Sequence, residues 1–76
     1  MFEKVKEILK QYTEVDESII TQEANLQNDL KLNSFDLMNI IVEFEDHFGI
    51  QIPNEDVGDL ITVQDVQNYL KTKGIQ

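Results

Sequence analysis

Cysteine and arginine are absent from the 76-residue chain, and histidine occurs only once, as His47. Without cysteine the chain has neither a disulfide nor a thiolate ligand for a metal, and one histidine cannot build a zinc site alone. A chain of this length forms one small domain, which we assign to residues 1–76, and buries only about 60% of the surface exposed by its unfolded chain. We therefore expect a modestly stable domain without a metal site.

Long apolar stretches are missing as well. The longest strictly apolar run is Ile40–Val42, whereas a membrane-spanning helix needs about 20 apolar residues. Glutamate and lysine alternate with apolar residues from the third position onward, which is unlike the apolar centre of a secretory signal peptide. The sequence predicts a soluble protein without membrane insertion, most simply a cytoplasmic one.

Positive charge is scarce: six lysines stand against fifteen acids, and the formal net charge is −9. Between Lys31 and Lys71 there is no other lysine and no arginine, whereas the same stretch carries eight acids. These acids are Asp36, Glu43, Glu45, Asp46, Glu55, Asp56, Asp59 and Asp65. Such a surface repels nucleic acids and anionic lipids and attracts basic partners. A simpler role in solubility remains an alternative.

Apolar residues recur with helical periodicity through most of the chain. Helices are predicted from Phe2 to between Tyr12 and Val15, from Asn33 or Ser34 to Gly49, around 54–60, and from Thr62 to just before Gly74. Asn33 and Thr62 are good N-cap residues, and each has an aspartate three positions further on. No strand pattern competes, so the fold class is all-α.

Residues 16–33 show no sustained period and predict a long loop between the first two main helices. Its apolar residues are spaced like anchors that hold the loop against a core: Ile19, Ile20, Leu26, Leu30 and Leu32. A connection of this length is uncommon in a compact domain and is often functional. The chain is thus expected to form a small four-helix bundle with three main helices, one short helix and this loop.

The helix from Ser34 carries two apolar stripes. The first faces the core and consists of Leu37, Ile40, Ile41, Phe44 and Phe48. The second, which we call the docking stripe, consists of Phe35, Met38 and Val42, and it is turned well over 90° from the first. It either packs under the long loop or forms an apolar interaction surface rimmed by acids. We favour the interaction surface.

Ser34 at the start of this helix is a poor candidate for a catalytic nucleophile. A nucleophilic serine needs a base within hydrogen-bond reach, but His47 lies thirteen residues further on, or roughly 20 Å along a helix. A serine at a helix start does, however, suit a phosphate, because free backbone N–H groups and the positive dipole end stabilise an anion. Position alone favours a cap without further function.

The run Asp29-Leu30-Lys31-Leu32-Asn33-Ser34-Phe35-Asp36 resembles the acyl carrier protein signature, commonly D-L-G-x-D-S-L-D, in which the serine bears phosphopantetheine. The segment FEDHFGIQIPNEDV resembles the acidic-F-G-x-x-I-P-x-E-D segment of that family, and ITVQDVQNYL resembles its last helix. The similarity covers nearly the whole chain. It implies an acyl-carrier-protein-like bundle in which Ser34 is both cap and attachment point.

Three residues depart from the family pattern: Lys31 replaces the usual glycine, Asn33 the usual aspartate and Phe35 the usual leucine. These departures indicate a specialised member with altered transferase or enzyme partners. The Ser34-Phe35 pair also resembles D-alanyl carrier proteins.

The resemblance implies a monomeric carrier without enzymatic activity and without nucleic-acid partners. Its cofactor would be 4′-phosphopantetheine, which a phosphopantetheinyl transferase takes from coenzyme A and attaches to Ser34, and its cargo an acyl thioester. Acyl-loading and synthase enzymes with basic patches would dock on Phe35, Asp36, Met38, Val42, Glu43, Asp46, Glu55 and Asp56. The acyl chain would be lined by Leu37, Ile41, Phe44, Ile52, Val57, Leu60 and Ile61.

Two functions remain beside an acyl carrier of fatty acid, polyketide or related biosynthesis. One is a D-alanyl or other aminoacyl carrier. The other is an unmodified acidic helical module that binds a basic partner while Ser34 only caps its helix. A small enzyme is the least consistent with the sequence.

Overall fold

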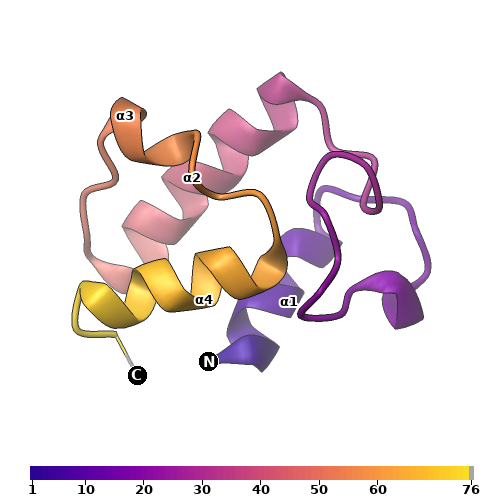
Figure 1. Ribbon diagram of the computed structural model, residues 1–76, viewed down its shortest axis with the longest axis horizontal. Helices are drawn as coiled ribbons and strands as arrows, with labels where there is room; N and C mark the ends of the chain where they lie inside the picture. The colour runs from indigo at the N-terminus through magenta and orange to yellow at the C-terminus, as the bar shows by residue number, and fades with distance from the viewer. Residues whose placement is uncertain (76) are drawn as a thin grey trace.

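The structure, a computed structural model that describes residues 1–75, confirms the all-α fold class. In chain order it contains α1 (Phe2–Lys10), the 3-10 helix η1 (Glu17–Ile19), α2 (Ser34–Phe48), α3 (Asn54–Val57) and α4 (Val63–Thr72). Its principal extents are 29 × 23 × 19 Å. Helix α2 runs diagonally across the molecule, with α3 on one side of it and the long loop at its N-terminal end (Figure 1).

The core lies between α1, α2 and α4, because α1 packs against both other helices. Each helix contributes the apolar face expected from its periodicity. The most deeply buried large side chains of the core are Phe44, Leu9, Leu30, Ile40, Leu70, Val5 and Val63. Leu37, Ile41 and Phe48, which were expected in the core, pack against it while remaining partly exposed.

Helix ends follow the local chemistry that the sequence indicated. Asn33 with Asp36, and Thr62 with Asp65, form complete capping boxes at α2 and α4. Gly49 ends α2 with φ = 67°, a left-handed conformation that favours glycine.

Two helices are shorter than expected. Helix α1 ends at Lys10 and continues as a turn through Tyr12, after which Thr13 Oγ1 donates to the Leu30 carbonyl at 2.6 Å. Helix α3 ends at Val57, and the next residues to Leu60 form i to i+3 turns. Both helices pass into turns with i to i+3 hydrogen bonds before they reach their expected ends, as helix termini often do.

The long loop is firmly held. Four of its five expected anchors, Ile20, Leu26, Leu30 and Leu32, are buried. The expectation for Ile19 is wrong, because this side chain is 45% exposed at the end of η1, and Ala24 is buried instead.

Backbone hydrogen bonds join this loop to the start of α4. The Leu26 N–H donates to the Ile61 carbonyl at 2.9 Å, and the Val63 N–H donates to the Ala24 carbonyl at 3.0 Å. The exchange forms one isolated antiparallel bridge between Asn25 and Thr62. The loop therefore behaves as part of the folded body, although it contains only three helical residues.

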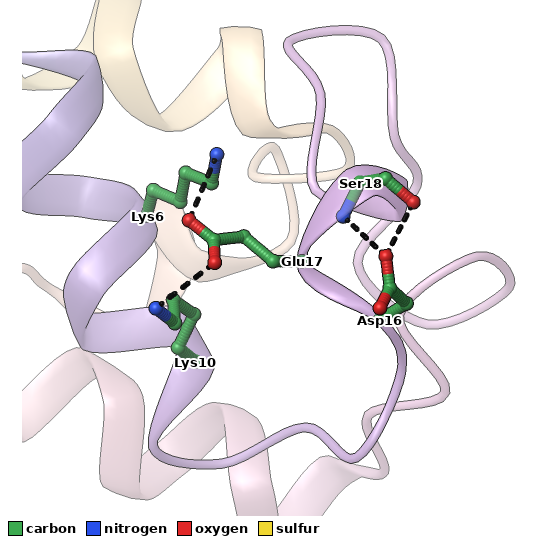
Figure 2. A network of polar contacts seen from close by, with 5 residues as sticks. All are labelled: Lys6, Lys10, Asp16, Glu17 and Ser18. Atoms are coloured by element: carbon green, nitrogen blue, oxygen red, sulfur yellow. Dashed lines mark hydrogen bonds and ion pairs between the residues drawn. The ribbon is translucent and has the colours of Figure 1, made fainter.

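An ion-pair clamp fastens η1 to α1 (Figure 2). The Glu17 carboxylate receives Lys6 Nζ at 3.4 Å and Lys10 Nζ at 3.3 Å. Both ammonium groups lower the pKa of Glu17, and Lys10 has the larger effect. Beside it, Asp16 Oδ2 accepts hydrogen bonds from the Ser18 hydroxyl at 2.5 Å and the Ser18 N–H at 3.0 Å, and these two bonds lower the pKa of Asp16.

Candidate functional site

Ser34 is the first residue of α2 and is exposed to solvent. The cap is its neighbour Asn33, whose Oδ1 accepts the Asp36 N–H at 2.8 Å. In return, Asp36 Oδ2 accepts the Asn33 N–H at 3.2 Å. Our prediction that Ser34 caps the helix is therefore wrong, because Asn33 provides the capping oxygen and the Ser34 hydroxyl is left out of the capping box.

The chain enters α2 through a tightly fixed segment. Leu30 and Leu32 are buried on either side of Lys31, and the Leu32 N–H donates to the Leu26 carbonyl at 3.2 Å. Lys31 has φ = 59°, a left-handed conformation that is costly for a side chain and free for glycine. The position of Ser34 is thus set by the loop anchors before it and by the capping box around it.

The docking stripe is open to solvent. Phe35 is 73% exposed, Met38 66% and Val42 53%. The alternative in which these residues pack under the long loop is wrong, since the loop instead buries its own leucines in the core. Three large apolar side chains on one exposed helix face, directly after Ser34, form a compact surface of the kind found at interface centres.

The acids expected around this stripe lie in different environments. Asp46 and Glu55 are exposed, whereas Asp36 and Glu43 are half-buried on the side of α2 that faces α1. On that side, partial burial and, to a smaller extent, the nearby Glu43 carboxylate raise the pKa of Tyr12. Asp56 is turned inward, where its Oδ2 accepts the Tyr69 hydroxyl at 2.7 Å.

The expected acyl-lining residues surround two surface depressions instead of one enclosed cavity. One depression, of about 440 Å³, is lined by Met38, Ile41, Val42, Glu45, Ile52, Asn54 and Val57. The other, of about 400 Å³, is lined by Asn25, Gln27, Asn28, Leu37, Val57, Gly58, Leu60 and Ile61. Val57 lines both depressions. Phe44 lines neither, because it is buried in the core with 1% of its surface exposed, and Ile61 is 54% exposed at a rim.

Sequence reasoning missed three polar residues. Glu45 Oε2 accepts the Ile52 N–H at 2.9 Å and so fastens the segment before α3 to α2. Tyr69 joins α4 to α3 through its hydrogen bond to Asp56. Partial burial and, to a smaller extent, the Asp56 carboxylate raise the pKa of Tyr69 to about 12. Gln67 is 6% exposed in α4, and its Oε1 lacks a hydrogen-bond partner among the described residues.

His47 lies near the C-terminal end of α2, and Ser34 is at the opposite end. Its ring packs edge-on against Phe48 with the ring centroids 4.9 Å apart. This placement agrees with the separation expected from the sequence. Within residues 1–75, no group of three histidine or acidic side chains is arranged to hold a metal ion. None of the helices described is both long and apolar enough to cross a membrane.

Residues 3–70 match the family described as phosphopantetheine attachment site. The chain is 38% identical over 73 residues to the acyl carrier protein of Thermotoga maritima. The aligned residues cover 96% of this chain and 90% of that protein. It is also 38% identical over 72 residues to the acyl carrier protein of Lactobacillus acidophilus. This alignment covers 95% of the present chain and 90% of that protein. The exposed serine at the start of α2 and these matches over nearly the whole chain agree: the chain belongs to the acyl carrier protein family.

Proposed function

We propose that Ser34 carries the 4′-phosphopantetheine arm and that the protein shuttles acyl groups on it between enzymes of fatty acid, polyketide or related biosynthesis. Members of the family are carriers and not enzymes, and they hold this group covalently. The observation that carries the assignment to Ser34 is the division of labour at the start of α2. Asn33 caps the helix, so the exposed Ser34 hydroxyl is left for another use.

The residues around Ser34 suit a phosphodiester. The first backbone N–H groups of a helix have no intrahelical acceptor and form a favourable end for an anion. The N–H of Asp36 is already taken by Asn33, which leaves the N–H groups of Ser34 and Phe35 for the phosphate. When attached, the arm supplies a thiol that bears the cargo as a thioester, which a chain without cysteine cannot supply itself.

The docking stripe and the acids beside it are proposed to receive the partner enzymes. Phe35, Met38 and Val42 offer apolar contacts next to the modified residue, while Asp46 and Glu55 offer exposed negative charge. A phosphopantetheinyl transferase, acyl-loading enzymes and synthases with basic patches would all approach this face. Charge attraction speeds the encounter, and a small contact permits release, as a monomeric shuttle requires.

The two depressions favour an alkyl chain over a polar aminoacyl group as cargo. Both linings contain large apolar side chains, including Ile41, Ile52 and Val57 in the first and Leu37 and Leu60 in the second. An alkyl chain gains free energy by leaving water for such a surface. A D-alanyl group has only one methyl group to bury and would gain little from either depression.

The first experiment is an intact-mass measurement after incubation of the apo protein with coenzyme A, magnesium and a broad-specificity phosphopantetheinyl transferase. Ser34→Ala is compared with Ser18→Ala, because the chain has only these two serines. Ser18 is exposed like Ser34, but its hydroxyl already donates to Asp16 (Figure 2). The wild type and Ser18→Ala should gain one phosphopantetheine, and Ser34→Ala should gain none.

Ser34→Ala should melt within about 2 °C of the wild type, because the capping oxygen belongs to Asn33 and exposed substitutions away from caps have small effects. Absence of any mass gain in the wild type with several transferases would support the unmodified interaction module. A gain that persists in Ser34→Ala would refute the assignment of the attachment site.

A further inference from the structure

Helix α3 is held in place by few contacts of its own. It comprises four residues, none of them is buried, and its N-cap Pro53 offers no side-chain hydrogen bond. Segments with so few buried contacts open at low cost while the rest of the fold stays intact. Apart from Val57, which packs partly buried against the core, the contacts that hold α3 come from its neighbours.

Two hydrogen bonds from rigid elements fasten α3 on both sides. On the α4 side, Tyr69 donates its hydroxyl to Asp56 Oδ2 at 2.7 Å. On the α2 side, Glu45 Oε2 accepts the Ile52 N–H at 2.9 Å. Helix α4 is itself anchored in the core by Val66 and Leu70. The Tyr69 hydroxyl is therefore the fixed end of its hydrogen bond, and Asp56 is the end that can move.

The position of α3 separates the two depressions. Val57, the last residue of α3, lines both the depression next to α2 and the one next to the Asn25–Asn28 turn. An outward movement of α3 would carry Val57 away and join the two spaces. Without Val57, the first lining is still mostly apolar, and the second retains Leu37, Leu60 and Ile61 beside three amide side chains. The joined space would therefore offer an apolar path for an alkyl chain longer than either depression can take.

We propose that the Tyr69–Asp56 hydrogen bond is a latch on α3, and that its release joins the two depressions into one cleft for an apolar chain. Tyr69 is then a positioning residue that sets how readily longer chains are taken up. The inference rests on the proposed function for the identity of that chain, which would be an acyl group on Ser34. The latch itself is a property of the apo protein.

The latch is tested by amide hydrogen exchange on the apo protein. The amides of Asp56, Asp59 and Leu60 report on α3 and the turn after it, because each donates within this segment. In Tyr69→Phe these amides should exchange about tenfold faster, the factor expected for loss of one hydrogen bond to a charged acceptor. Amides in the middle of α1 and α4 should stay within twofold of the wild type.

Two further variants separate the hydrogen bond from general effects of substitution. Tyr12→Phe removes the hydroxyl of the only other tyrosine and should leave the α3 amides unchanged. Asp56→Asn keeps an acceptor oxygen for Tyr69 and should therefore keep most of the protection seen in the wild type. Equal exchange of the α3 amides in Tyr69→Phe and the wild type would overturn the proposal.

The cleft is tested with butyryl- and octanoyl-phosphopantetheine loaded on Ser34, by following cleavage of the thioester with hydroxylamine. Release of the latch should slow cleavage of the octanoyl thioester at least threefold in Tyr69→Phe relative to the wild type. Cleavage of the butyryl thioester should change little, because a short chain fits without movement of α3. Equal octanoyl rates despite faster exchange of α3 would overturn the proposed cleft.

Failure of Ser34 to accept phosphopantetheine would refute the proposed function and not the latch. The apo protein is then titrated with Nile red, an uncharged apolar dye that the acidic surface does not repel. Binding at least threefold tighter to Tyr69→Phe than to the wild type would support a latch over an apolar cleft. Equal binding would overturn it.

Discussion

The face built by α1 and η1 and the face built by α2 and α3 treat their acids in opposite ways. On the first, Glu17 is shared by Lys6 and Lys10, so its negative charge is balanced within the fold (Figure 2). On the second, neither lysine nor arginine occurs between Lys31 and Lys71. Four acids of this segment instead accept hydrogen bonds from uncharged groups: Asp36, Glu45, Asp56 and Asp65.

The difference shows how a small domain can use acids for structure without giving up its surface charge. An N–H or hydroxyl donor stabilises a carboxylate but brings no positive charge to cancel it. The segment between Lys31 and Lys71 thus keeps the full charge of its acids, while Asp36 and Asp65 hold helix ends and Glu45 and Asp56 hold α3 and the segment before it. The α1–η1 face uses ion pairs to fasten the long loop. Negative charge therefore remains on the α2–α3 face beside the docking stripe, where a basic partner enzyme would approach.

The largest effect is expected from reversal of the charge on one face. Asp46→Lys with Glu55→Lys changes two exposed acids on the α2–α3 face. This double variant should lower the kcat/KM of phosphopantetheinylation about tenfold at low salt, because charge attraction speeds the encounter. Rates are measured by intact mass against time at low and high sodium chloride, and the deficit should shrink as salt screens the charges.

Glu3→Lys with Glu7→Lys provides the matched control. It makes the same change in net charge at two exposed acids on α1. Its rate should stay within about twofold of the wild type, since only charges near the approaching partner steer it strongly. An equal loss in both double variants would mean that net charge governs the encounter and that the two faces are equivalent.

Much of this arrangement could be predicted from the sequence because it depends on local chemistry. The periodicity of α2, the capping residues Asn33 and Thr62, and the stop at Gly49 each involve residues within one or two helical turns. The helical periodicity of α2 also predicted that the docking stripe faces away from the core, although the sequence left open whether the loop would cover it.

The missed features join residues that are distant in the chain. Tyr69 and Asp56 are thirteen residues apart, and Glu45 and Ile52 are seven apart. Neither link has a periodic signal, because each depends on how α3 lies between α2 and α4. The path of the long loop depends likewise on backbone hydrogen bonds to Ile61 and Val63. Ser34 was mistaken for a cap because adjacent residues at a helix start differ only in backbone geometry.

A smaller effect is expected at Lys31, after which no further lysine or arginine occurs before Lys71. Its φ of 59° costs a residue with a side chain roughly 1 kcal/mol relative to glycine. Lys31→Gly should therefore be more stable than Lys31→Ala by about 1 kcal/mol in urea unfolding, because both lose the charge and only alanine keeps the strain. Equal stability of the two variants would show that this backbone conformation is unstrained.

The smallest effect is expected at the ion-paired face. Glu17→Gln removes the shared carboxylate and should lower the Tm at pH 7 by roughly 1–4 °C, as expected for exposed ion pairs in a domain of this size. Glu23→Gln, in an exposed acid of the same loop, should leave the Tm nearly unchanged. Because the two ammonium groups lower the pKa of Glu17 in the folded protein, its stabilising effect exists above the ordinary value of 4.5. This effect is lost as the pH falls through the lowered value.

Differential scanning fluorimetry from pH 7 to pH 3 should therefore show the Tm curves of the wild type and Glu17→Gln converging on the acidic side. High salt at pH 7 should bring them together as well, since it screens an exposed pair. The same salt should raise the Tm of both proteins, because it also weakens the repulsion among the unbalanced acids of the α2–α3 face. A Tm difference between the two proteins that is unchanged by acid and salt would mean that Glu17 holds η1 by packing of its side chain. The contrast in charge between the two faces would then not extend to their stability.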